Sequence, residues 1–73
     1  MEDKFLDIVA NVFRIKKEEL NMNLQKDDIE TWDSLAHIAL VAELEEELGI
    51  EVPIEDVPNI KKLKDFERYF INN

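Results

Sequence analysis

The stretch DSLAHIALVAELEEELG, residues 33–49, contains the strongest helix signal in the chain. Asp33 is a good N-cap, because its carboxylate accepts hydrogen bonds from the free amides of the first turn and suits the positive end of the helix dipole. Gly49 is the only glycine and stands just beyond Leu48, where a left-handed residue that ends a helix costs glycine little. These signals predict a helix from Ser34 to Leu48.

The predicted helix has two apolar groups, because each residue advances by about 100° around the axis. The first group forms the core stripe, with His37 in its middle: Leu40, Val41, Leu44 and Leu48. The second is less regular and is bordered by acids: Leu35, Ile38, Ala39 and Ala42, then Glu45 and Glu46. Such a second group indicates a surface that meets a partner. The alternative is that Ile38 lies at the edge of the core and Leu35 packs on the preceding loop.

The rest of the sequence predicts an all-α fold. A helix over residues 3–14 follows from the spacing of its apolar residues: Phe5, Ile8, Val9, Val12 and Phe13. The long connection over 15–32 has apolar residues that would hold it on the core: Leu20, Leu24, Ile29 and Trp32. A short helical turn over Glu55 to Asn59 is expected next. A last helix, capped by Asn59, is indicated by Ile60, Leu63, Phe66, Tyr69 and Phe70. We expect one domain, residues 1–73, with three main helices and one short helix.

Composition limits the chemistry of this chain. It has 73 residues, no cysteine and one histidine, which excludes a disulfide or thiolate site and disfavours a metal centre. No apolar run approaches the roughly 18 residues that a membrane span needs, and we expect a cytoplasmic monomer. The net charge is -9, and no lysine or arginine lies between Asp27 and Val57. Such a field repels nucleic acid and attracts basic protein surfaces, although solubility alone also favours surface charge.

Ser34 is the only serine, and it stands in the first turn of the predicted helix. The amides of a helix N-terminus favour a phosphate group placed there. Ser34 and His37 are spaced as helix neighbours, but no oriented third residue or oxyanion hole is evident, which argues against a hydrolase. A calcium-binding EF-hand loop is also excluded, because residues 27–33 lack the glycine that it requires at its sixth position.

The tripeptide Asp33-Ser34-Leu35 at the start of a helix, followed by LEEELGIEVP at 44–53, resembles the acyl carrier protein family over essentially the whole chain. The resemblance implies that Ser34 accepts a 4′-phosphopantetheine arm, which a phosphopantetheinyl transferase takes from coenzyme A. The arm would supply the thiol that this chain lacks and would carry an acyl or aminoacyl group as a thioester. The protein would then be a carrier and not an enzyme. Its other implied partners are an acyl-loading ligase and downstream transferases or synthases with basic docking patches.

The resemblance also implies which residues meet these partners: Asp33, Leu35, Ile38, Ala42, Glu45, Glu46, Glu55 and Asp56. Many members of the family shelter the acyl chain between helices, and His37 would lie near that entrance. The alternative for His37 is a partly buried side chain that hydrogen-bonds to a loop.

The chain departs from the pattern of fatty-acid carriers around Ser34. Thr31 and Trp32 stand where those carriers have a glycine and a small residue, and Ala36 and Ala39 stand where they have acids. We expect Trp32 to anchor the loop on the core, with contact to the arm as the alternative. These departures suggest a specialised carrier. A function from another class is also open, namely an acidic helical interaction module without a prosthetic group.

Overall fold

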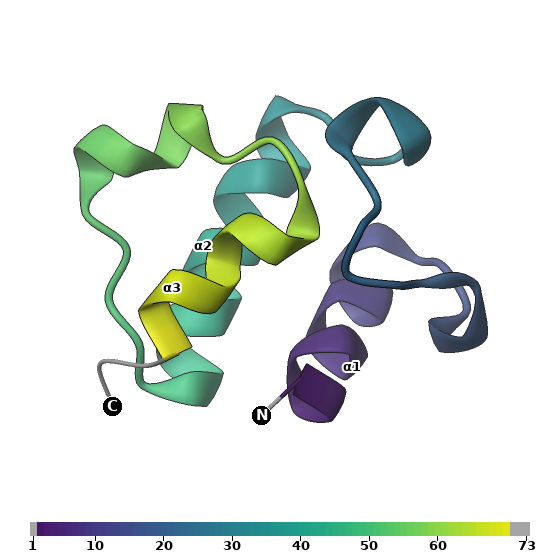
Figure 1. Cartoon of the computed structure of the whole chain (residues 1–73), viewed down its shortest axis with the longest axis horizontal. Helices are drawn as coiled ribbons and strands as arrows, with labels where there is room; N and C mark the ends of the chain where they lie inside the picture. The colour runs from purple at the N-terminus through teal and green to yellow at the C-terminus, as the bar shows by residue number, and fades with distance from the viewer. Residues whose placement is uncertain (1, 71–73) are drawn as a thin grey trace.

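The computed structural model describes residues 2–70. Its α-helices are α1 (Glu2–Phe13), α2 (Ser34–Leu48) and α3 (Glu67–Phe70), and they are joined by segments that contain short 3-10 helices (Figure 1). These are η1 (Lys17–Glu19), η2 (Lys26–Asp28), η3 (Ile54–Asn59) and η4 (Leu63–Phe66). The described residues contain no strand, and a single isolated bridge joins Gln25 to Lys62. The predicted all-α fold is confirmed.

Helix α1 buries one face of its amphipathic sequence, as its spacing predicts. Phe5, Val9 and Phe13 are completely buried. The helix ends at Phe13, one residue earlier than expected, because Arg14 adopts a left-handed backbone with a φ of 59°. The amide of Ile15 then donates to the carbonyl of Ala10 at 3.1 Å, which closes the helix end.

The long connection between α1 and α2 is held on the molecule at both of its short helices. The ammonium of Lys17 in η1 pairs with Asp3 at 2.6 Å and with Asp7 at 2.9 Å. These contacts raise the pKa of Lys17, and the hydrogen bond that its ammonium donates to Asp3 is the largest cause. The apolar residues of the connection behave as predicted: Leu20, Ile29 and Trp32 are buried, and Leu24 is half-buried against the core.

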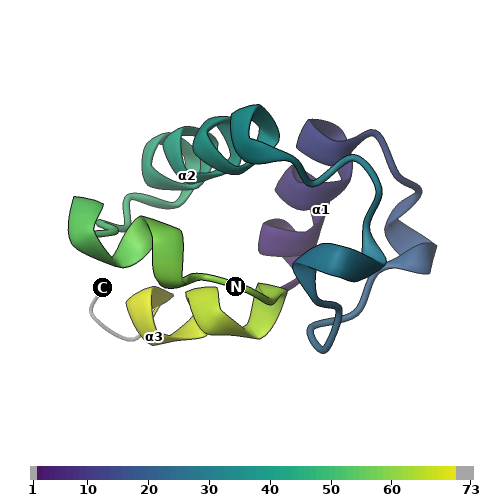
Figure 2. The same cartoon turned by 90° about the horizontal axis from the view of Figure 1, so that it is seen from above.

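Helix α2 has the predicted bounds and the predicted ends. The carboxylate of Asp33 accepts a hydrogen bond from the amide of Ala36 at 2.8 Å, and Gly49 ends the helix with a φ of 67°. Figure 2 shows α2 along one side of the molecule and α3 along the other, with η3 near the end that they share. The core fills the space between them. Its largest completely buried side chains are Phe5, Phe13, Phe66, Leu40, Leu44, Leu63 and Val9.

The last helical segment starts later than the sequence analysis expects. The prediction that Asn59 caps a helix beginning at Ile60 is wrong, because Asn59 is the last residue of η3. Residues 61 and 62 are instead paired with the first connection: Lys26 donates its amide to the carbonyl of Lys61 at 2.8 Å. The helical backbone resumes at Leu63 after Lys62, with the carboxylate of Asp65 accepting from the amides of both lysines.

Candidate functional site

The hydroxyl of Thr31 lies just before α2 and the hydroxyl of Ser34 lies at its first residue, and the two have different surroundings. Thr31 donates its hydroxyl to the carbonyl of Phe13 at 2.7 Å, which ties the loop to the end of α1. Ser34 is exposed, and its hydroxyl forms no hydrogen bond within the described part of the chain. Thr31 therefore has a structural role, whereas the hydroxyl of Ser34 is accessible to a reagent.

A hydrogen-bonded chain lies beneath Ser34. The indole of Trp32 donates to Nδ1 of His37 at 2.9 Å, and Nε2 of His37 lies 2.7 Å from the carbonyl oxygen of Val57. Because an indole N–H can only donate, Nδ1 accepts and Nε2 carries the proton that is donated to Val57. His37 therefore connects the loop before α2 to η3.

The burial of these two rings agrees with the structural alternatives of the sequence analysis. Trp32 is 3% exposed and packs on Phe13 with 5.3 Å between ring centroids. Trp32 is thus the predicted anchor of the loop on the core. His37 is 5% exposed, and both of its ring nitrogens have partners. Whether it also marks an acyl entrance stays a prediction.

The second apolar group of α2 is exposed. Leu35 is 83% exposed and Ile38 is 59% exposed, and the shorter side chains of Ala39 and Ala42 also face solvent. The alternative placement, with Ile38 at the core's edge and Leu35 packed on the loop, is therefore not what the structure shows. Ile54 at the start of η3 is 85% exposed and adds a third large apolar side chain.

Two open grooves follow α2 on the side of η3. The first, which we call the Ser34 groove, has a volume of about 420 Å³ and is lined by Lys26, Ser34, His37, Ile38, Ile54, Val57 and Pro58. The second has a volume of about 280 Å³ and is lined by Ile38, Val41, Ala42, Glu45, Val52, Ile54 and Val57. They share Ile38, Ile54 and Val57, so a largely apolar surface runs from Ser34 along α2.

The predicted contact acids fall into two kinds. Glu46 and Glu55 are exposed, as is the capping residue Asp33. Glu45 is half-buried and accepts a hydrogen bond from the amide of Val52 at 3.0 Å. Asp56 is also half-buried and accepts from the hydroxyl of Tyr69 at 3.0 Å. Glu45 and Asp56 therefore hold segments of the fold together, whatever contacts they make with a partner.

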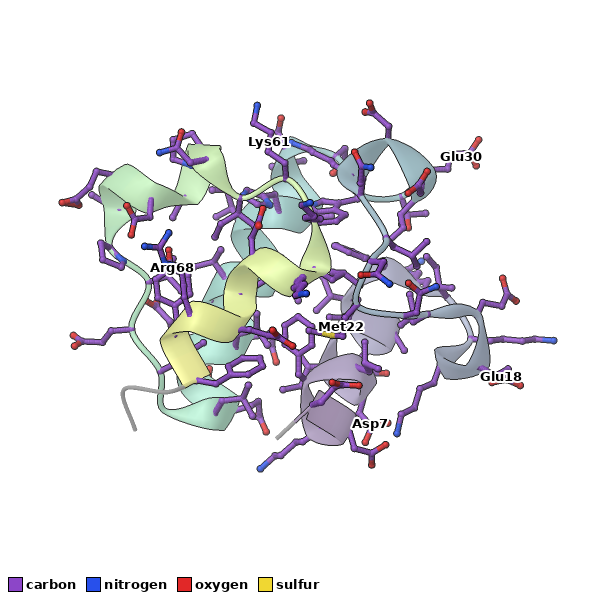
Figure 3. The ribbon with its side chains drawn as sticks, in the orientation of Figure 1. Asp7, Glu18, Met22, Glu30, Lys61 and Arg68 are labelled. Atoms are coloured by element: carbon purple, nitrogen blue, oxygen red, sulfur yellow. The ribbon has the colours of Figure 1, made fainter. Side chains whose placement is uncertain are left out.

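The contact between Asp56 and Tyr69 lies near the C-terminal end of the described chain. Burial raises the pKa of Tyr69, and the hydrogen bond to Asp56 raises it further. Arg68 lies over the ring of Tyr69, with 5.8 Å from its guanidinium carbon to the ring centroid. Figure 3 shows Arg68 within the outline of the molecule, whereas Glu18 and Glu30 extend from the edge of the molecule on the opposite side.

The sequence analysis missed four residues of the Ser34 groove: Lys26, Ile54, Val57 and Pro58. Ile54 carried a signal, because it is a large apolar residue between a proline and two acids, where an apolar side chain is not needed to form a helix. Lys26 is the last basic residue before the acidic stretch, but only the fold shows that it lines the same groove as Ser34. No group of three or more potential metal-ligating side chains was found within residues 2–70.

None of the helices described here is long and apolar enough to cross a membrane.

The model of one protein family, described as the phosphopantetheine attachment site, matches residues 3–70. This match favours a carrier over an interaction module without a prosthetic group.

Relatives of similar length agree with this family. The chain is 36% identical to the acyl carrier protein of Syntrophobacter fumaroxidans, over all of this chain and 90% of that protein. It is 33% identical to the acyl carrier protein of Rickettsia bellii, over 94% of this chain and 85% of the relative. It is 35% identical to the acyl carrier protein of Clostridium perfringens strain SM101, over 94% of this chain and 91% of the relative. The chain therefore belongs to the phosphopantetheine-binding acyl carrier protein family, as a carrier of acyl groups on phosphopantetheine and not as a catalyst.

Proposed function

We propose that Ser34 is the residue to which 4′-phosphopantetheine is attached in this carrier. The observation that carries the proposal is the contrast between the two aliphatic hydroxyls: Ser34 is exposed without a hydrogen-bond partner, whereas Thr31 is bonded to Phe13. A transferase needs access to a free hydroxyl, and only Ser34 offers it.

The surroundings of Ser34 suit a phosphodiester and an extended arm. Ser34 is the first residue of α2, where the amides of the first turn favour a negative group. The adjoining Ser34 groove offers about 420 Å³ beside apolar side chains. Phosphopantetheine supplies the thiol on which an acyl or aminoacyl group is held as a thioester. The residues of the chain hold the attachment point on a rigid helix end and leave it open to solvent.

The outer side of α2 is the surface that we propose for partner enzymes, which include the phosphopantetheinyl transferase. It combines exposed apolar side chains with exposed acids: Leu35, Ile38 and Ala42, with Asp33, Glu46 and Glu55. Apolar area supplies affinity in such interfaces, and the acids steer basic partner surfaces toward it. Glu45 and Asp56 belong to this proposed surface as well, although their carboxylates have partners within the fold.

We also propose His37 as the residue that an acyl chain displaces if it enters the core. The ring lines the Ser34 groove and is held by its bonds to Trp32 and Val57. Entry of the chain would break the bond from the indole, so the NMR resonance of the Trp32 indole N–H should shift when the protein is acylated. An unchanged resonance would mean that the acyl chain stays outside.

The departures around Ser34 support a specialised carrier. We further propose that the protein acts in the cytoplasm as a monomer, with residues 1–73 as one carrier domain. Trp32 fills space with a buried indole, and Ala36 and Ala39 lack the charge of an acid. Light scattering would test the monomer, and mass spectrometry of the protein from its native cell would test the cargo. A long-chain fatty acyl group as the main cargo there would contradict the specialised role.

The attachment site is tested by incubating the protein with coenzyme A, magnesium and a promiscuous phosphopantetheinyl transferase, followed by intact mass measurement. We expect a gain equal to one phosphopantetheinyl group, and no gain for Ser34→Ala. The matched control is Thr31→Val, which should still gain the group although it loses the bond to Phe13. A gain that survives Ser34→Ala would overturn the proposal.

A further inference from the structure

One cationic side chain lies in the Ser34 groove. Lys26 of η2 is half-buried and lines this groove together with Ser34 of α2 and Ile54 and Pro58 of η3. The remaining lining side chains are apolar apart from His37, whose ring nitrogens are both bonded. Among the residues that the structure describes, Lys26 is thus the only lysine, arginine or acid that lines the groove.

The backbone around Lys26 is fixed by its pairing with a distant segment. The amide of Lys26 donates to the carbonyl of Lys61 at 2.8 Å, and Gln25 forms a bridge with Lys62. The amide of Leu63 donates to the carbonyl of Leu24 at 3.0 Å. Lys26 therefore projects from a braced part of the connection and not from a loose loop.

The ammonium of Lys26 has no ion-pair partner among residues 2–70, although the chain has 18 acidic residues. The ion pairs of the described residues are both made by Lys17. Two acids follow Lys26 directly in the sequence. Asp27 is exposed and forms no ion pair with another described residue, and the carboxylate of Asp28 accepts from the amide of Gln25 at 2.9 Å. The side chain of a half-buried lysine without a carboxylate partner is available to an anion that enters the groove, and screening by solvent is weaker there than on an open surface.

We propose that Lys26 is a positioning residue for the phosphodiester that joins the arm to Ser34, a role that rests on Ser34 being the attachment site. Its ammonium pairs with a non-bridging phosphate oxygen and draws the start of the arm toward the groove between α2 and η3. The pair offsets part of the repulsion between the phosphate and an acidic protein. It also favours one direction of the arm, along the apolar side chains that the two grooves share.

The test compares modified and unmodified forms of three variants with the wild type. Lys26→Gln removes the charge from the groove, and Lys26→Arg keeps it. Lys61→Gln is the matched control, because Lys61 is exposed, pairs with Lys26 only through its backbone and does not line the groove. Figure 3 shows Lys61 at the edge of the molecule. The readouts are the melting temperature of both forms and the ³¹P chemical shift of the modified form.

For each protein, we subtract the melting temperature of the unmodified form from that of the modified form. At low salt this difference should be about 1–4 °C lower in Lys26→Gln than in the wild type. The gap between Lys26→Gln and the wild type should shrink at high salt. The ³¹P resonance should move in Lys26→Gln and stay in place in Lys61→Gln and Lys26→Arg. Equal changes in Lys26→Gln and Lys61→Gln would overturn the role of Lys26. This outcome can be distinguished from a failure of the proposal that Ser34 is the attachment site. In that case the phosphopantetheinyl group would be found on a residue other than Ser34.

Discussion

The two sides of α2 differ in what their residues do. The inner side is closed: Leu40 and Leu44 are completely buried, and His37 is bonded at both ring nitrogens. The outer side leaves Leu35 and Ile38 in solvent, next to the free hydroxyl of Ser34. One helix therefore separates stability from recognition, because apolar residues on its inner side hold the fold and those on its outer side are available to a partner.

The same division runs through the acids of α2. Glu45 and Glu46 are neighbours in sequence, but Glu45 accepts a hydrogen bond from the amide of Val52 and Glu46 is exposed. A run of glutamates that looks uniform in the sequence therefore contains a structural member and a free one.

The largest effect is expected from Leu44→Ala, on the inner side. Removing this completely buried side chain should lower the free energy of unfolding by about 2–5 kcal/mol, through lost burial and the cavity that remains. Leu35→Ala is the matched control on the outer side and should change it by less than about 0.5 kcal/mol. Urea denaturation measures both. Similar losses in the two variants would mean that α2 has no free side.

A smaller effect is expected from Glu45→Ala. Its carboxylate holds the segment after the helix at Val52, so its loss should lower the free energy of unfolding by about 1–2 kcal/mol. Glu46→Ala serves as the control, because it removes the same charge but breaks no such hydrogen bond. Thermal and urea unfolding measure both variants. If the two are equally stable, Glu45 does not stabilise the fold and acts only as a surface acid, like Glu46.

The smallest effect is expected from Tyr69→Phe, which tests whether Asp56 belongs to the fold. Losing the hydrogen bond to Asp56 should lower the free energy of unfolding by about 1 kcal/mol at neutral pH. Because the pKa of Tyr69 is raised above its usual 10.0, the folded protein keeps the phenol proton longer than the unfolded chain does.

The sign of the pH dependence follows from that shift. The contribution of the Tyr69 phenol to stability is complete below about pH 10 and is lost as the pH rises through the pKa of the folded state. The difference in stability between wild type and Tyr69→Phe should therefore decrease above pH 10. Measuring the difference cancels the titration of the lysines, which both proteins share. A difference that is constant to pH 11 would contradict the role of this hydrogen bond.

Much of the fold was predictable because its signals are local. The N-cap Asp33 and the C-terminal Gly49 bound α2 in the sequence, and the spacing of apolar residues predicted which side of α1 and α2 is buried. The burial of Trp32 was predictable from the area of its side chain. Ser34 was predicted as the candidate site from the family pattern around it.

The parts that sequence reasoning missed depend on contacts between distant segments. The last helical segment begins at Leu63 and not at Ile60, because Lys61 is paired with Lys26. Lys26 and Ser34 line the same groove, which no local spacing shows. Glu45 and Asp56 likewise appear as ordinary surface acids until their partners Val52 and Tyr69 are located.

The most direct test of the account locates the modification within the loaded protein. Fragment mass spectrometry of a peptide that contains both Thr31 and Ser34 distinguishes the two aliphatic hydroxyls, which differ in their hydrogen bonding. The account predicts that the whole phosphopantetheinyl group is on Ser34 and that Ser34→Ala, which stays folded, carries none. A group on Thr31, or a loaded Ser34→Ala protein, would contradict it.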